Sequence, residues 1–262
     1  MPILLRLLLP LFVASLMSGC AGRPAASEIM PSLRIAPQRV HDEPAPLVIV
    51  LPGRGDSLER LRAAGVAEAI QRGAPQAEVL LTGATLAYYL DGGLVRRLHE
   101  QIVTPELARG RREIWLVGFS MGGLGAMMYE RTHPRQVRGL MLIAPYLGDR
   151  KLIQEIRDAG GPAQWQAGPE PAALDRDNVS REQWRMVGRW TREPALAARI
   201  WLACGVEDSF LPAARMIAPY LPNAQVLETP GAHRMAVWVP MLVTLFERAL
   251  PAPPATLTSS EM

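Results

Sequence analysis

One serine of this chain stands in a pattern that is typical of a catalytic nucleophile. Residues 118–122 read Gly-Phe-Ser-Met-Gly, with Ser120 at the centre. The pentapeptide directly follows an apolar run at Ile114 to Val117 and directly precedes a helical pattern. A serine on a sharp turn between a strand and a helix needs glycine neighbours, because Cβ atoms would clash there. We therefore expect Ser120 to attack acyl groups; the alternative is an unreactive serine in a tight turn.

The base that such a serine requires has to come from the four histidines of the chain. A serine hydroxyl is a poor nucleophile at neutral pH, so the base must lie within hydrogen-bond reach. His41, His99 and His133 fall in an irregular N-terminal segment, a helical pattern and a helix end, respectively. His233 closes a loop marked by Pro-Gly after the last apolar run, where an open α/β sheet presents groups to its crevice. The sequence predicts His233 as the base, with a solvated loop histidine as the alternative.

A carboxylate is needed to fix the tautomer of the base and to stabilise the imidazolium that forms. Asp208 follows the apolar run at Ile200 to Cys204, which places it at the carboxyl end of that strand. Glu207 beside it and Asp149 after the preceding run are competing candidates, and each of them is otherwise a solvated loop charge. We choose Asp208 as the acid of the expected triad.

The oxyanion of a tetrahedral intermediate needs backbone donors beside the nucleophile. One is expected to be the amide of Met121, the residue after the nucleophile. The second is expected in the loop after the first core strand, where residues 52–56 read Pro-Gly-Arg-Gly-Asp. By position the amide of Arg54 is the first candidate and that of Gly53 the second. The alternative is a tight turn without a catalytic role.

Continuous apolar runs alternate with helical patterns along the chain, and this order predicts the fold. Continuous runs, unlike alternating ones, are typical of parallel strands that are covered on both faces. The runs lie at Leu47–Leu51, Glu78–Leu81, Glu113–Val117, Gly139–Ala144 and Ile200–Cys204, with a weaker one at Gln225–Glu228. Helical spacing is found at Leu58–Gln71, Leu94–Val103, Leu124–Thr132, Pro212–Leu221 and Pro240–Leu250. The alternation predicts one α/β domain with a mostly parallel sheet over residues 46–250.

Residues 147–194 interrupt this alternation between the fourth and fifth core strands. The segment is too long for an ordinary connection between a strand and a helix. We interpret it as a helical lid inserted beside the active site; the alternative is a peripheral helical decoration. Its aromatic residues either contact an acyl chain or form a small core of the insertion itself. They are Trp165, Trp184 and Trp190.

The N-terminus has the order of a secretory signal: a positive start, an apolar stretch at Leu7–Leu16, and small residues before Cys20. The apolar stretch is shorter than the roughly 20 residues of a membrane-spanning helix. The N-terminal segment as a whole resembles a bacterial lipoprotein signal. This resemblance implies that residues 1–19 are removed and that Cys20 is lipidated. Met17 is a departure, because Leu is usual at this position. With Ala21 after the cysteine, the resemblance implies an anchor in the outer membrane that faces the periplasm. A plain cleaved signal or an uncleaved anchor is the alternative.

Two further segments lie outside the expected core. Residues 20–45 are rich in Pro, Ala and Ser and predict a tether that ends in a short edge strand near Leu33 to Ile35. Residues 251–262 contain few large apolar side chains and predict a disordered tail. With Cys20 lipidated, Cys204 remains as a single thiol, which its apolar neighbours predict to be buried.

The composition excludes several other classes of function. Charges of both signs are interleaved, at a net charge of +3, so the chain has no basic stripe of the kind that binds nucleic acid. Histidines and cysteines are too widely spaced for a metal site. No metal, no cofactor and no nucleic-acid partner are expected, and the expected partners are a small acyl ester and the membrane.

Residues 46–250 resemble the α/β-hydrolase superfamily, in particular its esterases, lysophospholipases and thioesterases. The resemblance rests on the glycine-rich loop, the serine pentapeptide, Asp208 and His233, in the chain order Ser, Asp, His. Pro52 stands where family members often carry His, a departure that leaves the backbone donors of the loop intact. The resemblance implies the α/β-hydrolase fold and the triad. It does not imply the substrate, because this fold hosts many chemistries.

These observations predict a serine hydrolase that cleaves a carboxylic ester or thioester through an acyl-enzyme on Ser120. An acyltransferase with the same triad is an alternative, because the sequence does not distinguish water from an alcohol as the acceptor. The other alternative is a lipid-anchored binding protein that kept the fold and lost turnover. An intact triad disfavours it, since a non-catalytic protein has no physical reason to hold Ser, Asp and His at three strand ends.

Overall fold

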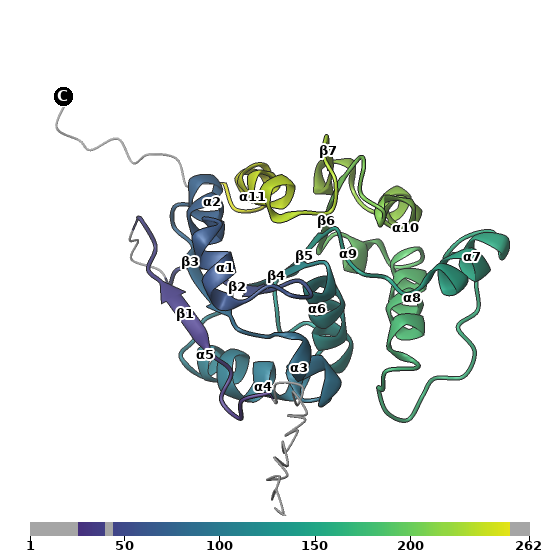
Figure 1. Ribbon diagram of the computed structural model, residues 1–262, viewed down its shortest axis with the longest axis horizontal. Coiled ribbons are helices and arrows are strands. Elements are labelled where there is room, and N and C mark those ends of the chain that lie inside the picture. Colours follow the sequence, from purple (N-terminus) through teal and green to yellow (C-terminus); the bar gives the residue numbers. More distant parts are fainter. Residues whose placement is uncertain (1–25, 40–43, 252–262) are drawn as a thin grey trace, which may run out of the picture.

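A seven-stranded sheet between helices forms the domain in the computed structural model, which describes residues 26–39 and 44–251 (Figure 1). The strands are β1 (Ser32–Ile35), β2 (Leu47–Leu51), β3 (Glu78–Thr82), β4 (Ile114–Phe119), β5 (Gly139–Ile143), β6 (Ile200–Gly205) and β7 (Val226–Thr229). Their order is β1-β3-β2-β4-β5-β6-β7, and each pairing is parallel except that of β1 with β3. The expected α/β class with a mostly parallel sheet is confirmed.

Helices cover both faces of this sheet. They are α1 (Leu58–Ala63), α2 (Val66–Gly73), α3 (Leu86–Leu90), α4 (Leu94–Leu98), α5 (Thr104–Ala108), α6 (Met121–Thr132), α7 (Arg150–Asp158), α8 (Val179–Trp190), α9 (Pro194–Ala197), α10 (Leu211–Ile217) and α11 (Met235–Ala249). A π-helical turn at His99–Val103 joins α4 to α5, and short 3-10 turns at Ala218–Tyr220 and Asn223–Gln225 precede β7. Helices α1, α2 and α11 lie on one face of the sheet, and α3 to α6 lie on the other (Figure 1).

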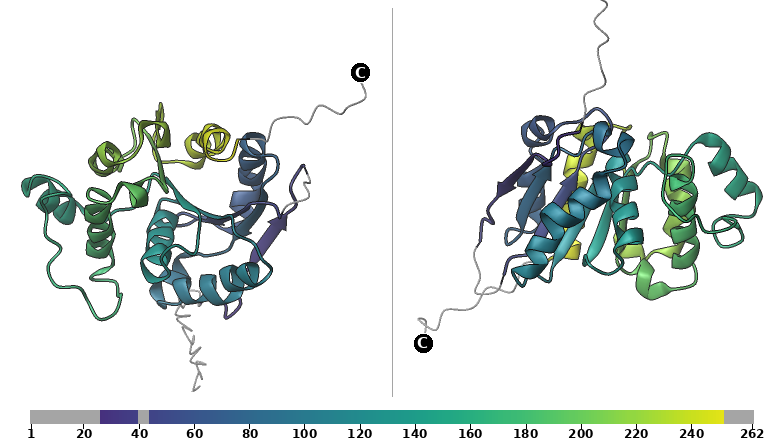
Figure 2. Two further views of the ribbon diagram at one scale, coloured as in Figure 1. Left: turned by 180° about the vertical axis from the view of Figure 1, so that it is seen from behind. Right: turned by 90° about the horizontal axis from the view of Figure 1, so that it is seen from below.

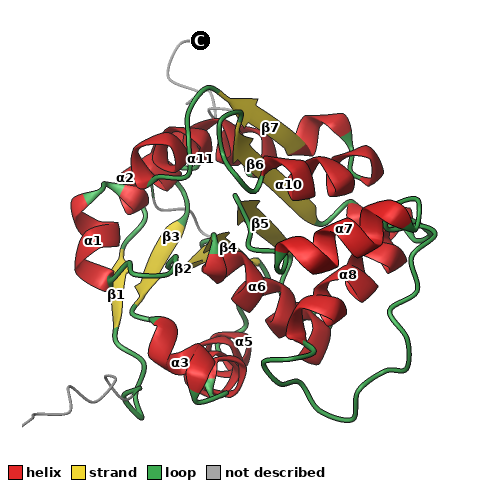
Figure 3. Ribbon diagram, turned by 45° about the vertical axis from the view of Figure 1, so that its right-hand side comes forward, coloured by secondary structure: helices red, strands yellow, loops and turns green. Residues whose placement is uncertain are grey.

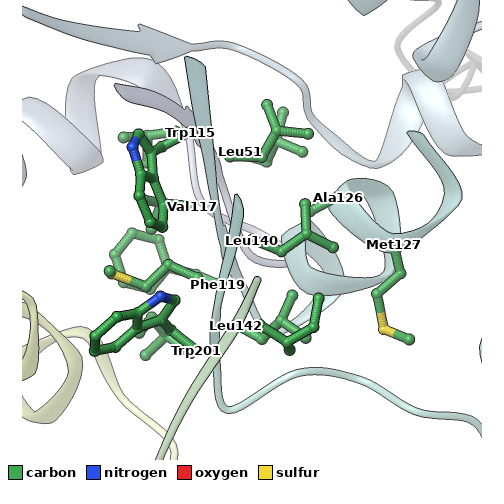
Figure 4. Close-up of a cluster of buried hydrophobic side chains, with 14 of the residues drawn as sticks. Leu51, Trp115, Val117, Phe119, Ala126, Met127, Leu140, Leu142 and Trp201 are labelled. Atoms are coloured by element: carbon green, nitrogen blue, oxygen red, sulfur yellow. The ribbon is translucent and has the colours of Figure 1, made fainter. Parts of the chain in front are cut away.

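The central strands are buried along their whole length, which accounts for their continuous apolar sequences. Every residue of β2, β4, β5 and β6 is buried. Trp115, Phe119 and Trp201 lie on one side of the sheet, and Leu140 and Leu142 lie on the other side, toward α6 (Figure 4). Full burial of one large apolar side chain contributes about 1.5–3 kcal/mol to stability. This two-sided core therefore holds the strand ends rigidly in place.

The structure divides two of the expected helices. The pattern at 58–71 forms α1 and α2, which are separated at Gly65, a residue with a φ of 71°. This left-handed backbone suits glycine, because it has no Cβ to clash. The pattern at 94–103 forms α4 and the π-helical turn and then continues into α5. Helix α3 was not expected at all.

The described part of the expected tether contains the edge strand of the sheet. β1 pairs with β3 in antiparallel register over its four residues. Met30, which precedes it, is only 4% exposed, and Arg34 within it donates hydrogen bonds to the carboxylates of Glu78 and Glu106. Because this segment pairs its backbone and buries apolar side chains, the packed domain begins before residue 46. Cys20, the signal segment and the expected tail from residue 252 onward lie outside the described residues.

None of the described helices is both long and apolar enough to cross a membrane. Cys204 is free and only 2% exposed, as expected of a buried thiol. Its burial raises the pKa of the thiol to about 12, so it remains uncharged at neutral pH and packs as a small apolar side chain.

Residues 147–194 contain α7, α8 and a long connection between them that loops away from the body of the domain (Figure 2, Figure 3). Helix α8 packs against α6, the helix that follows Ser120. Trp184 is fully buried, and its Nε1 donates a hydrogen bond to the carbonyl of Leu147 at 2.6 Å. Trp165 and Trp190 are buried as well. All three tryptophans belong to the same hydrophobic core as the strands of the sheet, so the insertion is packed onto the body of the domain and does not form a separate core.

Candidate active site

The structure brings together the three residues that the sequence singled out, although 113 positions separate Ser120 from His233. His233 Nε2 lies 2.9 Å from Ser120 Oγ, and His233 Nδ1 lies 2.7 Å from Asp208 Oδ2. A carboxylate only accepts hydrogen bonds, so Nδ1 carries the ring proton and Nε2 accepts from the serine hydroxyl. In this arrangement the imidazole is able to take the serine proton.

Ser120 occupies a strained turn between β4 and α6. Its φ of 51° and ψ of −110° lie in a region that residues other than glycine rarely adopt. A Cβ on Gly118 would overlap the carbonyl of Gly122, and one on Gly122 would overlap the carbonyl of Leu51. The Ser120 amide donates to the carbonyl of Ile143 at 2.9 Å, which ties the turn to β5. The two glycines thus let α6 begin directly against the sheet with the serine at the bend.

Asp208 and His233 are held from several sides. The Asp208 side chain is fully buried, and its second oxygen accepts from the Phe210 amide at 2.8 Å. The rings of Phe210 and Trp238 both meet the His233 ring edge to face, each with its centroid 4.6 Å away. Trp238 also stacks on Phe119, the residue before the nucleophile. The His233 ring is therefore held in one orientation in the free protein, as a preorganised catalytic base requires.

The two competing carboxylates have structural roles. Asp149 caps α7, because its side chain accepts from the Leu152 amide at 2.9 Å. The Glu207 carboxylate accepts from the amide of Gly231, and the Glu207 amide donates to the Gly231 carbonyl at 3.1 Å. Glu207 thus fastens the loop that carries His233 and does not itself contact the base.

Two of the remaining histidines form a stacked pair at the C-terminal end of α6. The rings of His99 and His133 lie 3.7 Å apart, with 7° between their planes. Burial, and secondly the neighbouring His99, lower the pKa of His133. The third, His41, lies outside the described residues. In the ranges 26–39 and 44–251, no three His, Cys, Asp or Glu side chains gather in a way that could hold a metal ion.

The expected oxyanion donors lie beside the nucleophile. A Cβ built on Gly53 would be 3.5 Å from the Cβ of Ser120, so this loop touches the serine turn. Met121 is the first residue of α6, where amides have no partner within the helix. Arg54 and Met121 both line the same cavity as Ser120. The loop that carries Gly53 and Arg54 and the first turn of α6 thus both adjoin the serine, and the donor roles of their amides stay a prediction.

A cavity of about 830 Å³ opens beside Ser120, within the range of sites for small molecules. One wall is a face of α6, whose members recur every three or four residues: Met121, Leu124, Gly125 and Met128. Most residues of the segment 86–95, which contains α3 and the start of α4, line the cavity. Residues 174–176 and 179–180 of the insertion, with Tyr146 and Phe210, complete it. Its lining is mainly apolar and aromatic.

Sequence reasoning missed the contribution of segment 86–95 to this cavity. Its apolar cluster Leu-Ala-Tyr-Tyr-Leu at 86–90 directly follows β3 at the carboxyl edge of the sheet, and this placement was the available signal. The tryptophans of the insertion do not line the cavity. Of the two roles expected for them, contact with substrate or packing of the insertion, the structure supports packing.

Comparisons with known proteins bear on the family and the fold of the chain. The family model Esterase, described as "Putative esterase", matches residues 89–243, more than half of the chain. No curated protein sequence matches the chain.

Solved structures with a similar fold include a ferulic acid esterase that is 16% identical, with a TM-score of 0.56. The aligned region covers 80% of this chain and 86% of the chain of that esterase. MPT51 (FbpC1) of Mycobacterium tuberculosis is 16% identical, with a TM-score of 0.57 over 84% of this chain and 93% of its own. S-formylglutathione hydrolase (FrmB) of Staphylococcus aureus is 12% identical, with a TM-score of 0.55 over 84% and 88%. At such identities the likeness is one of fold.

Proposed function

Because the chain belongs to the Esterase family of α/β-hydrolases, we propose that it cleaves a carboxylic ester or thioester through an acyl-enzyme on Ser120. The observation that carries this proposal is the hydrogen-bonded series from Ser120 Oγ through His233 to Asp208. The cavity beside the serine, with its apolar lining, supports a substrate that has an apolar acyl or alcohol part.

In this proposal the reaction has two similar halves, in which the acyl-enzyme first forms and is then hydrolysed. Ser120 Oγ bonds to the carbonyl carbon while His233 Nε2 takes the serine proton. The alcohol or thiol then leaves with the electrons of its bond and takes that proton from His233. Water next attacks the acyl-enzyme, His233 takes one of its protons, and Ser120 leaves with that proton as the carboxylic acid is released. Asp208 stabilises the imidazolium in both halves.

Backbone amides stabilise the oxyanion that forms in each half. In this proposal the Met121 amide is one donor and the Arg54 amide the other, with Gly53 as the second candidate in that loop. Their proximity to Ser120 supports these roles. Removing one such donor costs about 10²–10³ in turnover in other serine hydrolases.

The decisive experiment combines a reactive probe with a graded set of esters. We expect a fluorophosphonate to label the purified protein and the Ser120→Ala variant to remain unlabelled while its circular dichroism spectrum is unchanged. The ester panel includes acyl chains from acetyl to decanoyl and a ferulate, since one structural neighbour is a ferulic acid esterase. Equal labelling of variant and wild type would contradict the role of Ser120.

The same assay separates hydrolysis from acyl transfer and from binding without turnover. With an added alcohol as acceptor, a hydrolase still releases mainly the free acid, whereas an acyltransferase releases mainly the new ester. A binding protein without turnover releases neither product and takes up no probe.

The insertion at 147–194 supports a further part of the proposal, a lid that covers the substrate. Leu174 and Val179 contribute apolar side chains to the cavity from this segment. We expect their truncation to affect long acyl chains more than short ones, as set out below.

Attachment to the cell envelope is also proposed. The apolar stretch at residues 7–16 and the small residues before Cys20 support lipidation of that cysteine and an outer-membrane anchor facing the periplasm. Cys20→Ser should abolish incorporation of labelled palmitate and release the protein from the membrane fraction. Unchanged fractionation of this variant would contradict the lipid anchor.

A further inference from the structure

Arg54 places a positive charge in the lining of the catalytic cavity, beside the nucleophile. It is the second residue of the turn at 53–56, which is closed by a hydrogen bond from the Asp56 amide to the Gly53 carbonyl at 3.1 Å. Gly53 in turn approaches the Cβ of Ser120, and Arg54 and Ser120 line the same cavity. Arg54 is exposed, and no salt bridge among the described residues includes it. Its guanidinium is therefore available to a molecule in the cavity.

The turn itself is stabilised by a different arginine. Arg60 on α1 donates from Nη1 to the carbonyl of Gly55 at 3.2 Å, and its Nε lies 3.7 Å from the carboxylate of Asp56. Asp56, the acid nearest to Arg54 in the sequence, thus already has a cationic partner. Arg54 is not needed to hold the turn, and its side chain calls for another explanation.

The carboxylates that line the cavity have partners of their own as well. Asp91 pairs with Nη1 of Arg97 at 2.8 Å, and its other oxygen accepts from the Gly93 amide at 2.8 Å. Asp175 accepts from two backbone amides of its own turn, each at 2.9 Å. Neither of these acids forms a salt bridge with Arg54 in the described part of the chain. The protein therefore supplies no anion to this guanidinium.

The place of the charge, more than its lack of a partner, points to a ligand. An arginine on an open surface is stabilised by water and needs no other partner. Arg54 instead lies where a bound substrate displaces water, in a cavity whose lining is mainly apolar. A charge that loses its water needs a partner of opposite sign. Arg176 also lines the cavity, but Asp175 and Asp177 flank it in the sequence and offset its charge.

We propose that the Arg54 guanidinium binds an anionic group of the substrate, a carboxylate or a phosphate. The planar guanidinium donates two parallel hydrogen bonds to the oxygens of either group. The physiological ester then combines an apolar part, which contacts the α6 face of the cavity, with a negative charge near the scissile carbonyl. This inference rests on the proposed function of the same site and names the substrate class within it.

The test compares esters that differ in one charged group. The first pair is para-nitrophenyl adipate, whose acyl chain ends in a carboxylate, and para-nitrophenyl adipamate, which ends in an uncharged amide of the same shape. The second pair is butyryl glycerol phosphate and butyryl glycerol, which differ in a phosphate on the alcohol part. For each pair the measured quantity is the ratio of kcat/KM values, charged ester over neutral ester.

We expect Arg54→Gln to lower this ratio about tenfold in one of the pairs, because a charge-assisted hydrogen bond is lost on the charged ester alone. The pair that responds identifies the anion as an acyl carboxylate or as a phosphate on the alcohol part. Glutamine keeps the backbone amide, and both esters of a pair present the same carbonyl, so any change at the oxyanion site cancels in the ratio. Arg54→Lys should retain most of the ratio, since lysine keeps the charge.

Arg62→Gln is the matched control. Arg62 is an exposed arginine in the last turn of α1 and does not line the cavity, so its replacement removes the same charge from elsewhere. Both ratios should stay within about twofold of the wild type, because solvent and salt screen charges outside the cavity. Arg176→Gln should lower the ratio less than Arg54→Gln does, owing to the acids beside it.

Three results would overturn the inference. One is an unchanged ratio for both pairs in Arg54→Gln, and another is an equal fall in Arg62→Gln, which would reduce the effect to net charge. The third is a larger fall in Arg176→Gln than in Arg54→Gln, which would assign the anion to the insertion. Failure of the proposed function looks different: the wild type then hydrolyses none of the four esters, or Ser120→Ala hydrolyses them as fast as the wild type.

Discussion

The carboxyl ends of the strands and the insertion at 147–194 face the same cavity but are built in different ways. Ser120, Asp208 and His233 follow strands or strand-linked loops whose backbone is fixed by burial on both faces of the sheet. The insertion is joined to the common core through the buried Trp184, and it reaches the cavity with residues at the start of α8 and in the connection before it. The contrast teaches that the sheet positions the reacting groups, whereas less regular segments shape the space around them.

The largest effect is expected for Asp208→Asn. An amide at this position favours the wrong imidazole tautomer, so turnover should fall by up to about 10⁴-fold, as in other triads. The measurement is kcat on a short-chain ester. Asp149→Asn is the control, because asparagine caps a helix about as well as aspartate. Near-normal turnover in Asp208→Asn together with an inactive Asp149→Asn would transfer the acid to the end of β5.

A smaller but still large effect is expected from Trp184, which joins α8 of the insertion to the core of the domain. Trp184→Ala removes a fully buried indole and its hydrogen bond to Leu147, at a cost of about 3–5 kcal/mol in unfolding free energy. Urea denaturation measures this change. Activity should fall equally for all acyl chain lengths, because the indole does not line the cavity. A loss confined to long chains, with stability intact, would instead give Trp184 a role in substrate binding.

Truncations at the cavity face of the insertion should have the opposite signature. Leu174→Ala removes apolar contact with the far part of a long acyl chain, a loss of about 1 kcal/mol or roughly fivefold in kcat/KM on decanoyl esters. Acetyl esters and the melting temperature should change little. Equal losses on acetyl and decanoyl esters would argue against a lid that contacts the acyl chain.

The smallest effect is expected for the pH dependence of stability, through His133 at the C-terminal end of α6. This helix contacts both β4 of the sheet and α8 of the insertion. The pKa of His133 is lowered from its ordinary value of 6.5, chiefly by burial, so the folded state binds a proton less readily than the unfolded state. Stability should therefore be full above pH 6.5 and decline as the pH falls below that value. His133→Gln should show a weaker decline in melting temperature between pH 7 and pH 5. An identical pH dependence in the two proteins would show that His133 does not contribute.

The sequence alone predicted the central strands more accurately than the helices and the edge of the sheet. The continuous apolar runs predicted each central strand to within two residues, because a strand buried on both faces leaves little room for polar side chains. The expected single helix at 58–71 was wrong in one respect: Gly65 adopts a left-handed backbone and divides it. The edge strand β1 was expected near its observed place, but its full incorporation into the sheet depends on pairing with β3, which no local pattern reveals.

The sequence by itself predicted the kind of chemistry proposed for the site, because a serine between close-packed glycines, at the joint of a buried strand and a helix, leaves few other interpretations. The sequence favoured Asp208 as the acid, but only the tertiary structure shows which carboxylate contacts His233. Asp149, Glu207 and Asp208 all follow strands, and they differ in the direction in which each loop turns its side chain. The lining of the cavity was likewise decided by packing: Tyr88 and Tyr89 come from a short helix without a strong pattern, and they reach the site because α3 lies beside α6.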